Sequence, residues 1–219
     1  MSTVQEVRCW RCAHQHQATL FCPACRAIQL VPPQADYFSV LELPRHPALD
    51  EKLLAQRYYE LSRKLHPDLY QTGTPQEQEA SLKNTALLNR AYRVLRDPVQ
   101  RGQYWLELHD EQLGKDNNRV PAKLAALVFA VHEQLEAARA ARAAGKADEV
   151  QAELAPIRED LQAQLSRLRN ELDGNFSQWN ENGTQLDRLQ ALKGILSALA
   201  YLRTLLRDVE KESEASWNV

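Results

Sequence analysis

Residues 57–68 read RYYELSRKLHPD, and this stretch decides the fold because an amphipathic helix ends there at Pro67. The apolar side chains of that helix recur at the spacing of one helix face, at Leu54, Tyr58, Leu61 and Leu65. Asp50 is a suitable N-cap, since its carboxylate can accept backbone N–H bonds. The proline therefore leaves His66 and Asp68 on a rigid turn that is exposed to solvent.

A second amphipathic helix follows this turn. Thr74-Pro75-Gln76-Glu77 places an N-cap before a proline at the first helical position and a glutamate at the third. The apolar face continues with Ala80, Leu87 or Leu88, Ala91 and Leu95, and the helix ends near Asp97-Pro98. Because the loop from Pro67 to Gly73 is short, the two helices form an antiparallel hairpin. Shorter helices are predicted at residues 36–41 and 98–109.

Three longer amphipathic helices are predicted after the hairpin, at about residues 121–144, 148–172 and 185–212. Gly145, Gly174 and Gly183 lie at or near their ends, and residues 114–118 form the preceding loop. Leucines at three- and four-residue spacing predict the core of an antiparallel three-helix bundle. Because the chain has only 7 glycines and few β-branched residues, the sequence predicts an all-α protein.

Composition excludes several classes of function. The chain has 219 residues and a formal net charge of −2. Residues 1–35 carry three basic groups and one acidic group, residues 36–109 carry ten of each, and residues 110–219 are net acidic, so no part is basic enough to bind nucleic acid through phosphate contacts alone. Neither an apolar run of about 18 residues nor a secretory signal is present, so we expect no membrane span and no export. The four cysteines lie within 17 residues of one another, which is unlike a disulfide framework and favours the cytoplasm.

The cysteines form two CxxC pairs, Cys9 with Cys12 and Cys22 with Cys25. Four thiolates at this spacing suit one tetrahedral Zn²⁺ ion, which would supply the folding energy of residues 7–28, here called the knuckle. With four protein ligands the ion would be structural. A single iron in the same ligand set and a pair of redox-active dithiols are the alternatives. Val31-Pro32-Pro33 is predicted to be a stiff linker between the knuckle and the helices.

The hairpin resembles a J-domain on motifs that occur in order. These are Asp36-Tyr37-Phe38, His66-Pro67-Asp68, and the Ala91-Tyr92, Leu95 and Pro98 positions near the end of the second helix. The stretch RGQYWLELH at residues 101–109 is similar to the end of the J-domain in HscB-type proteins, some of which also carry an N-terminal knuckle with two CxxC pairs. The resemblance implies a metal knuckle at residues 7–28, a J-domain at residues 36–110 and a client-binding three-helix bundle at residues 120–212.

The resemblance to HscB-type proteins implies a co-chaperone of iron–sulfur cluster assembly that is not itself an enzyme. Its partners would be an HscA- or DnaK-type chaperone ATPase and an iron–sulfur cluster scaffold protein. His66, Pro67 and Asp68 would dock on the chaperone and stimulate its ATP hydrolysis. Arg57, Arg63 and Lys64, on the polar side of the preceding helix, would steer the docking through their charge.

The bundle would carry the scaffold protein to the chaperone. HscB-type proteins hold the scaffold with large apolar and acidic side chains, whereas this chain has smaller residues near Ala125 and Ala198, with Glu133 and Glu136 as acidic groups. The candidate client contacts on the first bundle helix are Leu124, Leu127, Val128 and Val131, and a place in the bundle core is the alternative for them. Two other functions stay open, a J-domain protein for another client and a thiol or iron redox protein.

Overall fold

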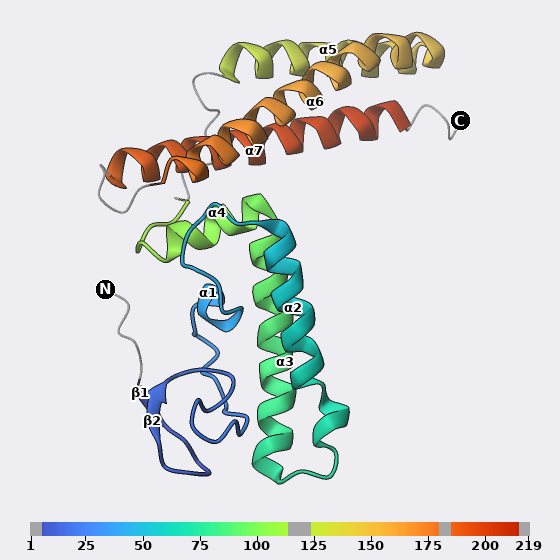
Figure 1. Cartoon of the computed structure of the whole chain (residues 1–219). Helices are drawn as coiled ribbons and strands as arrows, with labels where there is room; N and C mark the ends of the chain where they lie inside the picture. The colour runs from blue at the N-terminus through green and yellow to red at the C-terminus, as the bar shows by residue number, and fades with distance from the viewer. Residues whose placement is uncertain (1–5, 114–123, 180–184, 215–219) are drawn as a thin grey trace. The chain divides into compact units, whose positions relative to one another are not determined.

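The computed structural model describes residues 6–113, 124–179 and 185–214 (Figure 1). The chain forms two compact units, Met1–Arg101 and Gly102–Val219, which are described separately below. The division falls inside a helix, α4 (Pro98–Glu107). The sequence placed a boundary later, in the loop at residues 114–118, which lies outside the described residues together with Gly183.

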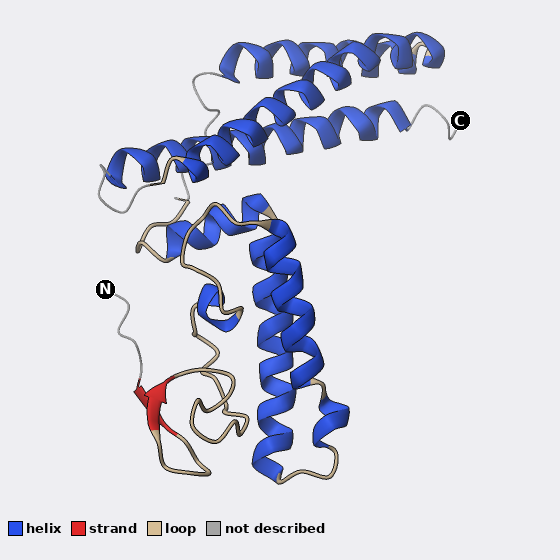
Figure 2. Ribbon diagram, viewed as in Figure 1, coloured by secondary structure: helices blue, strands red, loops and turns tan. Residues whose placement is uncertain are grey.

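The knuckle contains the β-structure that Figure 2 shows in red. Strand β1 (Glu6–Arg8) pairs antiparallel with β2 (Gln15–Gln17), and the first cysteine pair lies in the loop between them. An isolated bridge between Phe21 and Ile28 encloses the second pair in the same way. Each strand has only three residues, which is too short for a period-2 pattern to predict it from sequence.

The helical hairpin forms where the sequence predicts it. The short helix α1 (Tyr37–Val40) precedes α2 (Glu51–Leu65), the 3-10 helix η1 (Pro67–Tyr70) and α3 (Pro75–Arg96), and α2 and α3 lie side by side in Figure 1. Asp50 caps α2 by accepting hydrogen bonds from the backbone N–H groups of Lys52 and Leu53. Thr74 and Glu77 form the predicted capping box at the start of α3.

The interface between α2 and α3 is apolar along most of its length. The side chains of the two predicted stripes are buried, at Leu54, Leu61, Leu65, Ala80, Leu87, Leu88, Ala91 and Leu95. Tyr58 differs because it is only partly buried and stacks on Tyr92, with 4.1 Å between ring centroids and an interplanar angle of 12°. The apolar stripes therefore hold the two helices together up to a stacked aromatic pair at the outer edge.

The segment that directly follows the knuckle is bonded to α3 through Asn84, whose side chain is completely buried. Its amide nitrogen donates a hydrogen bond to the Gln29 carbonyl at 2.7 Å, and its Oδ1 accepts one from the Val31 N–H at 3.1 Å. Val31 is itself buried, so the predicted stiff linker Val31-Pro32-Pro33 begins at a residue that is bonded to α3. The backbone that follows the knuckle is thereby fixed to the helical hairpin of α2 and α3.

The second unit is an all-α bundle, as predicted. Helices α5 (Ala125–Ala143), α6 (Ala147–Ser177) and α7 (Gln185–Glu214) all contact one another, most extensively between α6 and α7. Gly174 lies within α6, so the helix is longer than its sequence predicted. The core leucines include Leu154, Leu161, Leu165, Leu172, Leu189, Leu192, Leu196, Leu199 and Leu202.

The second half of α4 belongs to the bundle unit and packs closely on α7. A Cβ added at Gly102 would meet Leu196 Cδ2 at 3.2 Å, so the glycine permits this close approach. Trp105 meets Trp179 edge to face, with 5.4 Å between ring centroids. Within the described parts of the chain, no helix is both long and apolar enough to cross a membrane.

Candidate functional sites

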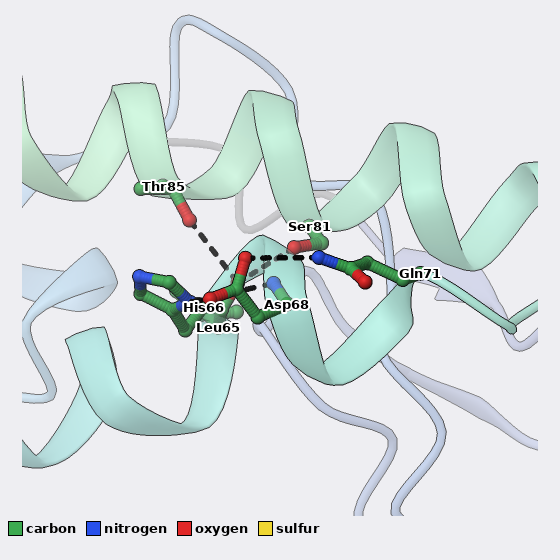
Figure 3. Close-up of polar contacts among 6 residues, drawn as sticks. All are labelled: Leu65, His66, Asp68, Gln71, Ser81 and Thr85. Atoms are coloured by element: carbon green, nitrogen blue, oxygen red, sulfur yellow. Dashed lines mark hydrogen bonds and ion pairs between the residues drawn. The ribbon is translucent and has the colours of Figure 1, made fainter.

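The turn between α2 and α3 carries the predicted His66-Pro67-Asp68 motif (Figure 3). The side chains of His66 and Asp68 are 56% and 70% exposed. His66 Nδ1 accepts the backbone N–H of Asp68 at 3.3 Å, so in the neutral ring the proton is on Nε2. The Gln71 amide donates a hydrogen bond to Asp68 Oδ1 at 3.2 Å. Both side chains are thus available to a partner and held in one orientation.

Hydroxyl groups complete the end of α2, where helix geometry leaves the last carbonyls without partners. Ser81 and Thr85 of α3 both donate to the Leu65 carbonyl, at 2.6 and 3.2 Å, as Figure 3 shows. The Tyr70 hydroxyl donates to the Lys64 carbonyl at 3.0 Å, and burial raises the pKa of Tyr70, as does the nearby Glu77 carboxylate. These three contacts anchor the turn to α3.

The three basic residues predicted to steer docking lie on α2 as expected but differ in their pairing. Arg57 is half-buried and pairs with Glu42 at 3.8 Å and with Glu60 at 3.3 Å. Arg63 and Lys64 are exposed, and among the described residues neither forms an ion pair. The free positive charge beside the turn therefore comes from Arg63 and Lys64.

The four predicted cysteine ligands come together in the knuckle. Their sulfur atoms lie within 4.8 Å of one another, with 3.6 Å between Cys9 and Cys25 and 3.7 Å between Cys12 and Cys22. A tetrahedral ion with bonds of about 2.3 Å needs sulfur atoms about 3.8 Å apart, so the four residues fit one metal ion of this kind. In the described part of the chain this is the one group of such residues close enough to hold a metal.

Backbone geometry prepares these sulfur atoms for a metal. Burial alone would raise the pKa of the Cys9 thiol, but the N–H groups of Cys12 and Arg11 and the Cys12 and Cys25 thiols bring this pKa down to about 6. The His14 N–H lowers the pKa of Cys12, yet burial and the other three thiols raise it to about 12. Four adjacent thiols resist ionising together without a cation, and a divalent metal removes this repulsion.

The candidate client contacts on α5 and just before it are mostly buried. Leu124, Val128 and Val131 belong to the bundle core and are not available to a partner, while Leu127 is partly exposed. Sequence reasoning missed Phe129, whose side chain is 73% exposed. Phe129, Glu133 and Glu136 share one exposed face at the helical spacing of four and three residues. The sequence signal for Phe129 was a large aromatic residue next to the apolar stripe that contains Val128 and Val131, but not part of that stripe.

Comparisons with known proteins identify relatives of both units. Residues 36–104 match the DnaJ domain family. Two curated relatives are the iron–sulfur cluster co-chaperone protein HscB of Homo sapiens, 39% identical over 106 residues, and that of Mus musculus, 38% identical over 105. These matches cover 47% and 46% of this chain and 45% of each relative, which is less than half of either protein.

Solved structures extend the likeness beyond the J-domain. The crystal structure of human co-chaperone protein HscB matches with a TM-score of 0.69 and 26% identity, over 93% of this chain and 97% of the human one. Chaperone HscB from Vibrio cholerae matches in fold, with a TM-score of 0.59 and 23% identity over 83% of this chain and 99% of that one. The resemblance predicted from the His66-Pro67-Asp68 turn and its flanking helices is therefore confirmed.

Proposed function

We propose that this HscB-type J-domain protein acts as a co-chaperone in iron–sulfur cluster assembly. In this role the His66-Pro67-Asp68 turn docks on an HscA- or DnaK-type chaperone and stimulates its ATP hydrolysis. The bundle binds the iron–sulfur scaffold protein and delivers it to that chaperone. The protein contributes binding energy and orientation to both partners and catalyses no reaction of its own.

The observation that carries this proposal is the fixed orientation of an exposed imidazole and carboxylate. Because Leu65 and Lys64 are anchored to hydroxyl groups, the turn loses little conformational freedom when it binds. Asp68 can form a bidentate ion pair with an arginine of the chaperone, and His66 can donate from Nε2. Arg63 and Lys64 accelerate the encounter with an acidic surface of that partner.

Replacement of Asp68 by Asn tests the docking role, because the amide keeps the shape and loses the charge. We expect Asp68→Asn to weaken stimulation of the chaperone ATPase by about tenfold or more. The measurement is steady-state ATP hydrolysis by a purified DnaK-type chaperone, with circular dichroism to follow helix content. Glu79→Gln, at an exposed carboxylate on α3, is the matched control. Full stimulation by Asp68→Asn would contradict the J-domain role.

The exposed face of α5, formed by Phe129, Glu133 and Glu136, is the client contact that we propose. A large aromatic side chain can anchor an interface, and the two carboxylates can pair with basic groups of a scaffold protein. Leu127 lies next to this face and extends its apolar part. This assignment replaces the contacts expected at Leu124, Val128 and Val131, which are buried.

The client contact is tested by binding of a purified iron–sulfur scaffold protein to the full chain. We expect Phe129→Ala to weaken this binding by about thirtyfold, which corresponds to the loss of one aromatic anchor of about 2 kcal/mol. Leu186→Ala on α7 also removes an exposed large apolar side chain and should leave the binding intact. If the scaffold protein does not bind the native chain while ATPase stimulation persists, the J-domain serves a different client.

The metal that we propose for Cys9, Cys12, Cys22 and Cys25 is one structural Zn²⁺ ion. When bound, zinc supplies no redox chemistry and holds the two CxxC turns in place. The reducing cytoplasm keeps such thiols available and is the compartment that suits the site. Metal analysis should return one equivalent of zinc in a colourless protein. Bound iron, or two dithiols that titrate without metal, would favour the redox alternatives.

A further inference from the structure

The second half of α3 carries positive charge for which the described residues offer no counter-ion. Between Ala80 and Arg96 the chain contains four basic residues and no acidic one. Lys83 pairs with Glu79 one turn earlier. Arg90, Arg93 and Arg96 are exposed, and within the described parts of the chain none of them forms an ion pair. The proposed docking role of the turn does not use these three arginines.

Two of these arginines line a pocket of about 660 Å³ where α2 and α3 meet the start of α4. Its aromatic wall is the stacked pair Tyr58 and Tyr92. The Arg96 guanidinium carbon lies 5.9 Å from the centre of the Tyr92 ring, within the range of a cation–π contact. Arg93 lies nearly one helical turn before Arg96. An apolar aromatic surface is thus bordered by two guanidinium groups.

Hydrogen bonding inside the pocket leaves these groups available. The Tyr58 hydroxyl donates to Asn89 Oδ1 at 3.0 Å, which fixes the position of the phenol ring. Asp97 is the acidic residue of the lining, and its Oδ1 accepts the N–H groups of Val99 and Gln100 as the N-cap of α4. Asp97 uses Oδ1 in capping, and among the described residues it forms no ion pair with Arg93 or Arg96, so the two guanidinium groups remain available to a ligand.

We propose that this pocket is a second docking site, which binds an acidic linear segment of a protein partner. Carboxylates of the segment pair with Arg93 and Arg96, and an apolar side chain between them packs on Tyr58 and Tyr92. Aromatic residues and arginine are the types most enriched in the energetically dominant parts of protein interfaces. Within the described residues the pocket offers two unpaired arginines in a chain of net charge −2, which is too little positive charge for a nucleic-acid track, so charge complementarity favours a short acidic peptide.

The pocket is distinct from the chaperone-docking turn. Tyr92 lies about 16 Å along the α3 axis from Ser81, which anchors that turn. None of the residues that line the pocket belongs to the turn, so a partner segment in the pocket leaves His66 and Asp68 exposed. The proposal goes beyond the proposed function, since it needs no contact between the turn and a chaperone.

A labelled peptide tests the proposal on the full-length chain. The probe is a short fluorescein-labelled peptide in which a central phenylalanine is flanked on each side by glutamate and aspartate. Fluorescence anisotropy should show saturable binding that weakens as sodium chloride is raised. Arg93→Gln combined with Arg96→Gln should weaken the binding by about tenfold or more. Arg167→Gln combined with Arg169→Gln, at exposed positions of α6, changes the net charge equally and should have no effect.

Each other outcome would overturn the proposal. The proposal fails if the native chain does not bind the peptide, or if both double variants bind it equally. It also fails if the peptide with glutamine and asparagine in place of the acids binds as tightly, or if a single-stranded oligonucleotide binds the pocket and the peptide does not. Stimulation of the chaperone ATPase, measured in parallel, should persist in the Arg93→Gln, Arg96→Gln variant. A failure of the proposed function would instead appear as a lack of ATPase stimulation by the native chain and would leave peptide binding intact.

Discussion

Both units are packed through apolar helix stripes, but the first unit is joined in addition by buried hydrogen bonds of single polar side chains. In the first unit, single polar groups join segments that are far apart in sequence: Asn84 holds the backbone after the knuckle, and Ser81 holds the end of α2. In the bundle, apolar stripes on α5, α6 and α7 pack into one core. Directional bonds fix the position of a loop or a metal site, whereas apolar stripes define a shape and tolerate substitutions that conserve volume.

Removal of the metal should have the largest effect on the first unit. Binding of structural zinc contributes about 10–16 kcal/mol to the folding of a small metal domain, so a chelator should unfold residues 7–28. Because Gln29 and Val31 are bonded to Asn84, loss of the knuckle also leaves a buried amide without partners in α3. Hydrogen exchange should therefore increase in the knuckle and around Asn84, and stay unchanged in α5–α7. Unaltered protection around Asn84 would show that the knuckle is an independent module.

Truncation of a buried side chain in the bundle should have the next largest effect. It should destabilise the bundle and leave the first unit unchanged. Leu161 of α6 is completely buried, so Leu161→Ala removes apolar contacts and leaves a cavity. We expect the free energy of unfolding of the bundle to fall by about 2–5 kcal/mol. Gln162→Ala, at the adjacent exposed position, is the control. Metal content of the knuckle should not change, and a loss of metal in Leu161→Ala would show that the units are coupled.

Replacement of Asn84 by Leu tests the two hydrogen bonds that Asn84 forms with Gln29 and Val31. The two side chains have similar size, but leucine leaves the Gln29 carbonyl and the Val31 N–H buried without partners, which costs about 2 kcal/mol or more. Since metal binding and knuckle folding are one equilibrium, apparent metal affinity should fall by about thirtyfold. Competition with a chromogenic chelator measures this affinity, and Leu82→Ala, exposed on the same helix, is the control. Equal metal affinities of the native chain and Asn84→Leu would mean that these hydrogen bonds do not stabilise the knuckle.

Much of the first unit was predictable from sequence because its helix signals are local. Asp50 and Thr74 cap helices that begin at the next residue, and α2 ends at Leu65, two residues before Pro67. Four cysteines in two CxxC pairs likewise specify a ligand set without knowledge of the fold. The docking of the knuckle could not be predicted in this way, since Asn84 contacts residues more than fifty positions earlier. A buried asparagine in a helix also looks the same in sequence as an exposed one.

The candidate client contacts on α5 show a second limit of sequence reasoning. Helical periodicity assigns Leu124, Val128 and Val131 to one face of α5, but it does not say whether that face meets a partner or the rest of the bundle. Packing against α6 and α7 decides the question and buries that face. Phe129 lies off the stripe, so an account based on periodicity passes over it. A large apolar residue outside the periodic face, such as Phe129, is therefore the one to examine for exposure.

The smallest predicted effects are two changes in stability of opposite sign, one in each unit, from substitutions at residues with positive φ. Ala13 follows the first CxxC pair with φ of +62°, a left-handed conformation that costs a residue with a Cβ about 1 kcal/mol. Gly145, at the turn after α5, has φ of +81°, and an added Cβ would meet no atom within 4 Å. Ala13→Gly should therefore stabilise the metal-bound knuckle by up to about 1 kcal/mol, and Gly145→Ala should destabilise the bundle by a similar amount. Hydrogen exchange in each unit measures both changes. Two changes of the same sign would show that flexibility of the unfolded chain, and not backbone strain, decides the outcome at these turns.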